Sequence, residues 1–278
     1  MKTIESNIPF NYKTIKVTQS RIDKGLLAIP VSLIDYFPKQ KTKVFVAFDK
    51  SLKVSSKNFT PYTSSSRECR IGGLRSFYEN LQIKDGDELV VQILDEKKYR
   101  IFGEKQFENF VKRNEKELDE SKDETEVSLK LKQISKFTNS NFRETVLSEY
   151  FRLSKNKIQK RKYKSVRVGE IKESVPPSIR KILSEIYNGK CQITNFGFLM
   201  KSRKPYFEIH HIRPDLGNHL KNLLVVCPNI HAQFTYAKVE EYFDEEEWLR
   251  RVKLNDNEYI VNHIIDNIPK KFEKEIHY

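Results

Sequence analysis

The chain has 278 residues and a formal charge of +13, from 51 Lys and Arg against 38 Asp and Glu. Its content of 38% hydrophobic and 12% aromatic residues is enough for two modest cores, so the composition is not that of a disordered chain. No apolar run approaches the ~18 residues of a membrane-spanning helix, and the first residues lack the apolar stretch of a signal peptide. We therefore expect a cytoplasmic protein without a membrane partner. The length favours two modules and a connector, and the charge favours nucleic acid as the partner.

Residues 12–102 predict a small barrel-like β domain. The predicted strands are short, rich in Val, Ile and Phe, and bounded by turn residues: KTIKVTQS, GLLAIPV, TKVFVAF, RECRIGGL and DELVVQIL. Two short helices are expected in IPVSLIDYF and LRSFYENLQI, and KDGD at 84–87 predicts a tight turn around Gly86. We place the first domain at residues 1–103.

Residues 104–170 are predicted to form a helical, charged and basic linker. The stretch EKQFENFVKRNEKELDESKDETEVSLKLKQ is almost free of Gly and Pro and alternates in charge sign, and NFRETVLSEYFRL has apolar residues at helical spacing. Residues 152–167 then carry eight Lys or Arg and no acid. This basic stretch is either a solvated hinge or an arm that contacts DNA phosphates.

Residues 171–278 are predicted to form a second domain, which makes the fold class α+β. PSIRKILSEIYNG predicts a helix that begins at paired prolines and ends before Gly189. A β-hairpin is expected over CQITNFGFLMKSRKPYFEIHHI, followed by the loop RPDLGNHLKN, the short strand LLVVC and a helix that opens near Pro228.

The segment EIHHIRPDLGNHLKNLLVVCPNIHAQF, residues 208–234, resembles the HNH nuclease motif, also called the His-Me or ββα-metal finger. The residues that carry the resemblance fall in the family's order and spacing: His210, His211, Pro214, Gly217, Asn222, Leu223, Cys227, Pro228 and His231. Imidazole, with its pKa near 7, is suited to deprotonate the water that attacks a phosphodiester.

The resemblance implies a role for each of the four motif residues. His211 would be the general base, Asn222 would brace the loop between the strands, and His210 and His231 would bind one divalent ion. The family habit is Mg²⁺, and two histidine ligands also permit Mn²⁺. His219, His263 and His277 match no motif position, and we expect no catalytic role for them.

Many relatives in this family carry two Cys-x-x-Cys pairs that bind a structural zinc. Here the corresponding positions are Cys191 with Thr194 and Cys227 with Ile230, so half of each pair is missing. Two cysteines alone make a poor four-coordinate site, and we expect no structural zinc. The third cysteine, Cys69, lies in the other domain, and three scattered cysteines do not predict a disulfide framework.

The first domain resembles the B-three-type DNA-binding pseudobarrel of plant transcription factors and of effector domains in some restriction endonucleases. The likeness rests on VTQSRIDKGLLAIP, on FP at 37–38 and on RECRIGGLRSFYENLQIKDGDELVVQIL. By position, the resemblance implies two arms that grip the major groove: Gln19, Ser20, Arg21 and Lys24 in the first, and Ser64, Ser65, Ser66, Arg67, Arg70 and Arg75 in the second. Arg suits guanine, Gln suits adenine, and Ser and Lys suit phosphates.

Together these features predict a type II restriction endonuclease that hydrolyses double-stranded DNA at a specific sequence. One alternative is a modification-dependent nuclease, which would need a pocket for a flipped base. Another is a DNA-binding regulator whose finger is only structural. A double-strand break needs two active sites or two visits by one, which is compatible with a homodimer on DNA although no residue argues for it.

Overall fold

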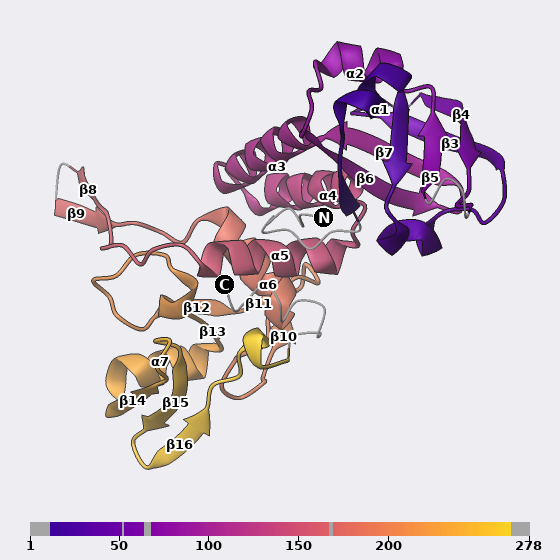
Figure 1. Ribbon diagram of the computed structural model, residues 1–278. Coiled ribbons are helices and arrows are strands. Elements are labelled where there is room, and N and C mark those ends of the chain that lie inside the picture. The colour runs from indigo at the N-terminus through magenta and orange to yellow at the C-terminus, as the bar shows by residue number, and fades with distance from the viewer. Residues whose placement is uncertain (1–11, 52, 64–67, 167–168, 268–278) are drawn as a thin grey trace. The chain divides into compact units, whose positions relative to one another are not determined.

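The computed structural model describes residues 12–51, 53–63, 68–166 and 169–267, and it divides into two compact units (Figure 1). The first unit comprises the described residues up to 116 together with 136–140, and the second comprises 117–135 and the chain from 141 onward. The class is α+β, as expected. The domain boundaries at residues 103 and 170 stay a prediction. No helix within the described ranges is long and apolar enough to cross a membrane.

The first unit is built on one curved seven-stranded sheet. Its strands are β1 (Tyr12–Lys16), β2 (Leu26–Ile29), β3 (Thr42–Phe48), β4 (Val54–Thr60), β5 (Cys69–Gly72), β6 (Glu88–Asp95) and β7 (Lys98–Gly103). The order β1-β6-β7-β3-β4-β5-β2 leaves β1 and β2 as edges, so the barrel is not fully closed. Neighbours are antiparallel except β3 and β7. The five predicted strands are present, and β4 and β7 are additions.

Alternation of inward and outward side chains explains this sheet. In β3 the side chains of Val44 and Val46 are fully buried while Phe45 between them is exposed. Phe59, Ile71 and other inward residues of the neighbouring strands complete the same core.

Helices close the ends of the sheet. The predicted first strand ends early, because residues 19–24 form the helix α1 (Gln19–Lys24), which stops at Gly25 with φ 62°. A Cβ at residue 25 would lie 3.0 Å from the main-chain nitrogen of Arg75, so glycine also permits close approach to α2 (Arg75–Leu81). The first expected short helix is a 3₁₀ helix, η1 (Val31–Tyr36), and the expected turn at 84–87 places Gly86 at φ 88°.

The predicted helical connector consists of three helices: α3 (Glu104–Asp119), α4 (Glu124–Thr138) and α5 (Phe142–Ser154). An aromatic cluster holds the start of α3 and the end of α4 to β7. In this cluster Phe102 lies 5.3 Å from Phe107 and 5.1 Å from Phe137, ring centroid to ring centroid. The buried Gln92 of β6 donates a 2.9 Å hydrogen bond to the carbonyl of Phe137, which fixes the end of α4.

In the second unit, α5 packs against α6 (Pro177–Tyr187). Asn141 and Glu144 form a capping box at the start of α5. Between the two helices, β8 (Tyr163–Val166), in the last part of the basic stretch, pairs antiparallel with β9 (Gly169–Lys172), which follows that stretch. The sequence predicted neither strand.

The remaining elements of the second unit are short. They are β10 (Phe198–Leu199), β11 (Pro205–Tyr206), β12 (Glu208–His211), the 3₁₀ helix η2 (Leu220–Asn222), β13 (Leu223–Val226), α7 (Pro228–Tyr236), β14 (Val239–Phe243), β15 (Leu249–Leu254), β16 (Asn257–Ile260) and the 3₁₀ helix η3 (Ile264–Asn267). The hairpin predicted over 191–212 is present only as the short pair of β10 and β11, and β12, which was expected to belong to it, pairs with β13 instead. The buried run Leu223–Val226 offers β12 an apolar partner that the exposed β10 does not.

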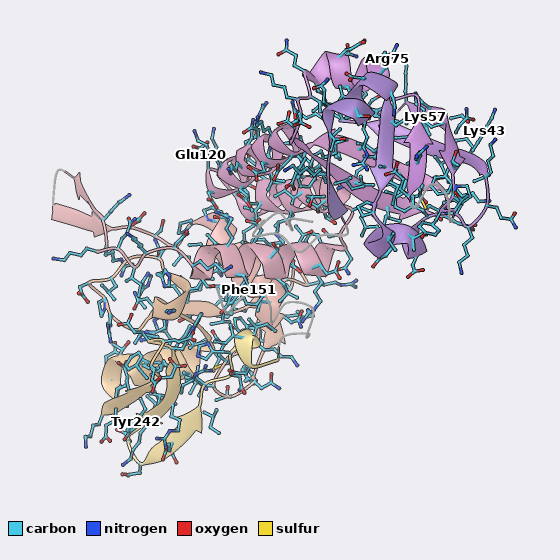
Figure 2. The ribbon with its side chains drawn as sticks, in the orientation of Figure 1. Lys43, Lys57, Arg75, Glu120, Phe151 and Tyr242 are labelled. Carbon is cyan, nitrogen blue, oxygen red and sulfur yellow. The ribbon has the colours of Figure 1, made fainter. Side chains whose placement is uncertain are left out.

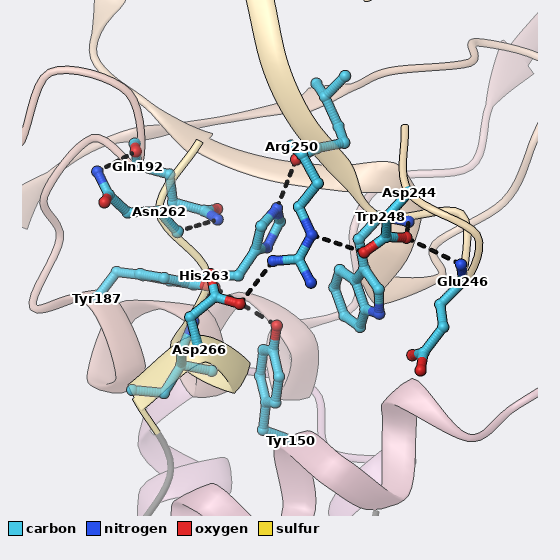
Figure 3. Close-up of polar contacts among 12 residues, drawn as sticks. Tyr150, Tyr187, Gln192, Asp244, Glu246, Trp248, Arg250, Asn262, His263 and Asp266 are labelled. Atoms are coloured by element: carbon cyan, nitrogen blue, oxygen red, sulfur yellow. Dashed lines mark hydrogen bonds and ion pairs between the residues drawn. The ribbon is translucent and has the colours of Figure 1, made fainter. Parts of the chain in front are cut away.

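A polar network ties the end of the described chain to this unit (Figure 3). Arg250 of β15 makes 2.6 Å ion pairs with Asp244 and Asp266. The hydroxyls of Tyr150 and Tyr187 lie 3.4 Å apart between α5 and α6. Burial raises the pKa of Tyr187 to about 12, so both hydroxyls stay protonated near neutral pH.

Candidate active site

Three histidines of the predicted motif gather on β12 and α7. In the pairing of β12 with β13, His210 lies opposite Leu224 and His211 opposite Leu223. The chain then leaves β13 at Cys227 and enters α7 through Pro228, a residue suited to the first helical position, which brings His231 into the first turn. Successive residues of a strand face opposite sides, so His210 and His211 point in different directions.

The ring of His211 is held by a residue that the motif did not identify. The Nε2 of His211 lies 3.0 Å from the Oδ1 of Asn218, and the Nδ2 of Asn218 donates to the carbonyl of Ser174 at 3.1 Å. Because the amide is oriented by Ser174, its oxygen faces the ring, which favours the tautomer of His211 that carries its proton on Nε2.

Asn222 joins the two ends of the loop between β12 and β13. Its Oδ1 accepts a 2.8 Å hydrogen bond from the main-chain nitrogen of Arg213. Its Nδ2 faces the carbonyls of Arg213, Leu216 and Gly217 at 3.1 to 3.3 Å. The side chain is buried, so these bonds compete little with water. Asn222 thus supports the segment that carries Asn218, and its effect on catalysis stays a prediction.

His210 and His231 face each other across the strand and the helix. Their ring centroids lie 5.3 Å apart, and the ring of His210 stacks on Phe234 of α7 at 4.1 Å. Burial, with smaller effects from the neighbouring His231 and His211, lowers the pKa of His210 to about 4. The imidazole of His210 is therefore neutral at pH 7 and has a lone pair for a metal ion.

Glu208 positions His231, and the sequence reasoning missed this residue too. One carboxylate oxygen of Glu208 contacts the Nδ1 of His231, and the other accepts a 2.9 Å hydrogen bond from the hydroxyl of Tyr206. The bond to His231, opposed by burial and aided by Tyr206, lowers the pKa of Glu208. A signal was present: Glu208 lies two residues before His210 in one strand, so both share a face.

These residues fit the divalent ion that the motif implies. His210 offers a neutral imidazole, and the carboxylate on Nδ1 of His231 leaves its Nε2 for a metal, which is a common arrangement around metal-binding histidines. No group of three or more His, Cys, Asp or Glu among the described residues is placed to hold a metal ion. An ion at this place would thus have two protein ligands and open positions for water and phosphate oxygens.

The two cysteines of the incomplete zinc positions belong to the apolar core of this unit. Cys191 and Cys227 are both buried free thiols and pack with Ile193 and Ile230. The hydroxyl of Thr194 lies 3.9 Å from the sulfur of Cys227. Burial raises the pKa of the Cys191 thiol, but hydrogen bonds from the Thr194 side chain and from the backbone of Thr194, Cys227 and Ile193 outweigh it, and the net shift is downward. The absence of zinc stays a prediction.

The residues predicted to read DNA lie on α1, β5 and α2 of the first unit. Glu68 connects two of them: its carboxylate binds Arg21 at 2.7 Å and Arg70 at 2.9 Å. Burial raises the pKa of Glu68, but the hydrogen bonds and charges of the two guanidinium groups outweigh it, and the net shift is downward. Both arginines are thereby held side by side.

The other predicted contacts surround this pair. Gln19 binds Asp23 at 2.7 Å, and Arg75, labelled in Figure 2, donates to the carbonyl of Asp23 at 2.6 Å. Ser20 and Lys24 are exposed on α1. The predicted contacts Ser65 and Arg67, together with Ser64 and Ser66, lie outside the described residues. The first arm is a helix, where a strand and its loop were expected.

No protein-family model matches the chain, and no curated protein matches it. Nine chains of solved structures are similar to part of it, and two of them are described here. One is an Arabidopsis FUS3–DNA complex, with 16% identity, a TM-score of 0.28, and coverage of 34% of this chain and 95% of that chain. The other is the N-terminal domain of Helicobacter pylori LlaJI.R1, with 17% identity, a TM-score of 0.27, and coverage of 33% of this chain and 77% of that chain. Neither match assigns a function to the chain.

Proposed function

We propose that this protein is a metal-dependent DNA endonuclease of the type II restriction class, whose second unit cuts and whose first unit reads the sequence. The observation that carries the proposal is the arrangement on β12, its loop and α7. His211, oriented by Asn218, lies next to the facing pair His210 and His231. The charge of +13 supports a polyanionic substrate.

In the proposed reaction, the imidazole of His211 accepts a proton from the attacking water. The hydroxide adds to phosphorus as the bond from phosphorus to the 3′-oxygen breaks. The cut strand then has a 5′-phosphate on one fragment and, after the 3′-oxygen takes a proton from water, a 3′-hydroxyl on the other. A divalent ion, Mg²⁺ by the family habit or Mn²⁺, would be held by His210 and His231 and would supply positive charge to the phosphate oxygens. Asn222 and Asn218 keep the base in place throughout.

Features of the first unit support its proposed role, which is to read a sequence in double-stranded DNA. Arg21 and Arg70 are paired through Glu68, and each keeps more than a third of its side chain exposed (35% and 40%). Two guanidinium forks at the protein surface suit guanine edges in the major groove. Two copies of the protein bound at one site could each cut one strand, so we include a homodimer on DNA in the proposal.

The test is plasmid cleavage by the purified full chain with Mg²⁺, followed by sequencing of the fragment ends. We expect discrete fragments, no cutting in EDTA, and restoration by Mg²⁺ or Mn²⁺. His211→Ala should lower the single-turnover rate by about 10²–10⁴, the usual contribution of a positioned base. Binding of the specific duplex in Ca²⁺ should hardly change.

Other results would contradict the proposal. Near wild-type cutting by His211→Ala would exclude this base, and full cutting in EDTA would exclude the metal role of His210 and His231. A band shift without cutting would favour a regulator with a structural finger. Cutting of methylated but not of unmethylated plasmid would favour a modification-dependent nuclease.

A further inference from the structure

A cavity of about 510 Å³ lies in the second unit, beside the loop that joins β12 to β13. One wall is the basic stretch after α5, with Lys157, Lys160 and Lys162. The opposite wall is the loop itself, with Gly217, Asn218 and His219. Glu173, Pro176 and Ile179, from the start of α6 and the residues before it, complete the lining, so three segments of the chain form the cavity.

Main-chain hydrogen bonds hold the two walls together. The nitrogen of Gly217 donates to the carbonyl of Gln159 at 2.7 Å, and the nitrogen of Arg161 donates to the carbonyl of Asp215 at 2.8 Å. A Cβ at residue 217 would lie 3.2 Å from the oxygen of Gln159, so glycine permits this close approach. Because the backbone of the basic stretch is pinned here, its lysines are presented at a defined place.

The lining favours an anion. Against the three lysines, Glu173 is the one acid among the described residues that line the cavity. The lysine side chains are exposed, so they can move onto a ligand. The surplus is two positive charges at neutral pH, which suits one phosphate group.

His219 is a buried residue of the same wall. It is 6% exposed, and its Nδ1 accepts the main-chain N–H of Lys221 at 3.2 Å, so the ring proton lies on Nε2. Burial lowers the pKa of His219, although the nearby main chain of Asn156 and Ser154 opposes the shift. Hydrogen bonds from the His219 ring to the main chain of Asn156 and Ser154 tie this loop wall to the start of the basic stretch.

The cavity is also one side chain away from the candidate base. Asn218 lines it and at the same time accepts the Nε2 proton of His211. A group bound in the cavity would therefore lie next to the reacting phosphodiester.

We propose that this cavity binds a backbone phosphate of the DNA substrate that neighbours the scissile phosphate, and that Lys157 and Lys160 are its main cationic contacts. The identity of the ligand as DNA rests on the proposed function, whereas the affinity for phosphate does not. Filling the cavity would order the basic stretch against the loop and so steady Asn218 and His211.

Inorganic phosphate is the first probe. It is titrated at constant ionic strength into the ¹⁵N-labelled full chain, while NMR follows the Asn218 side-chain amide and the His219 ring. We expect saturable shifts in wild type and binding weakened about tenfold or more in Lys157→Gln/Lys160→Gln, the scale of charged hydrogen bonds. The matched control Lys155→Gln/Lys201→Gln removes the same charge from exposed residues outside the cavity and should bind as wild type does. Shifts that do not saturate, or that respond equally in both double variants, would overturn the site.

The second probe is a specific duplex with one neutral methylphosphonate placed at each position around the cut, bound in Ca²⁺. We expect one position near the scissile bond where the replacement weakens wild type about tenfold but leaves Lys157→Gln/Lys160→Gln unaffected. If phosphate binds and no such position exists, the cavity serves a free phosphate compound and the DNA assignment is wrong. A chain that binds phosphate there but cuts no DNA would contradict the proposed function and leave the anion site standing.

Discussion

The Oδ1 of Asn218 lies 3.0 Å from the Nε2 of His211 and is itself oriented by a hydrogen bond from Nδ2 to the carbonyl of Ser174. Asn218 therefore decides which nitrogen of His211 carries the proton. This is a positioning role, because Asn218 acts on the reaction through the ring of another residue.

The first prediction concerns Asn218. Asn218→Ala should lower the single-turnover cleavage rate, by less than the about 10²–10⁴ expected on loss of the base itself. Asn218→Asp places a carboxylate at the ring and so favours its protonated form. Since the reaction needs neutral His211, the acidic limb of the pH–rate profile should move to higher pH. Full activity with an unchanged profile in both variants would show that Asn218 does not act on His211.

The second prediction concerns Glu208. Its carboxylate contacts the Nδ1 of His231, and Glu208→Gln removes the charge while keeping the size of the side chain. We expect the Mg²⁺ or Mn²⁺ concentration for half-maximal cleavage to rise about 10- to 100-fold, the usual cost of losing such a partner. Tyr206→Phe removes the second hydrogen bond to Glu208 and should have a smaller effect. An unchanged metal requirement in Glu208→Gln would separate Glu208 from the metal site.

The third prediction concerns the paired arginines of the first unit. If each reads a base edge, Arg21→Ala and Arg70→Ala should each cost about 1–3 kcal/mol of specific binding. Non-specific, salt-sensitive binding should remain, because it rests on many phosphate contacts. Lys43→Ala, which removes one exposed charge from β3, serves as the control in gel-shift titrations. Specific binding as tight as wild type in both arginine variants would place recognition elsewhere.

The fourth prediction concerns stability against pH. Burial lowers the pKa of His210 to about 4 and lowers the pKa values of His219 and His263. In the unfolded chain these rings have pKa values near ~6.5. The unfolded state therefore binds more protons as pH falls, and the free energy of unfolding should decrease from about pH 7 toward pH 4.

Urea unfolding in EDTA at pH 7.5, 6.5 and 5.5 measures this dependence. His263 is buried against Trp248 and donates from Nε2 to the carbonyl of Leu249 at 2.7 Å. His263→Gln should flatten the decrease even if it lowers stability at every pH. A free energy of unfolding that stays constant or rises from pH 7.5 to 5.5 would contradict the prediction.

Much of the candidate site could be predicted from the sequence because its residues lie close together in the chain. Residues 208–231 form a strand, a loop, a second strand and a helix start in direct succession, so the order of His210, His211, Asn222 and His231 already implies their proximity. The strands of the first unit were predicted for a similar reason, since alternation of inward and outward residues is a property of each strand alone.

Only the tertiary structure decided the partners of these residues. Glu68 contacts Arg21 at a separation of 47 residues in the sequence, and Gln159 contacts Gly217 at a separation of 58. The periodicity of the sequence does not predict such contacts. The sequence marks Asn218 and His219 only as loop residues, whereas the structure shows the contact of Asn218 with His211 and the burial of His219 beside a basic cavity. The helix α1 replaced the end of a predicted strand because Gly25 allows a left-handed turn against α2. Local sequence patterns thus determined the helices, the strands and the order of the motif residues. Contacts between residues far apart in the chain determined which side chains orient the motif residues and which charged groups surround them.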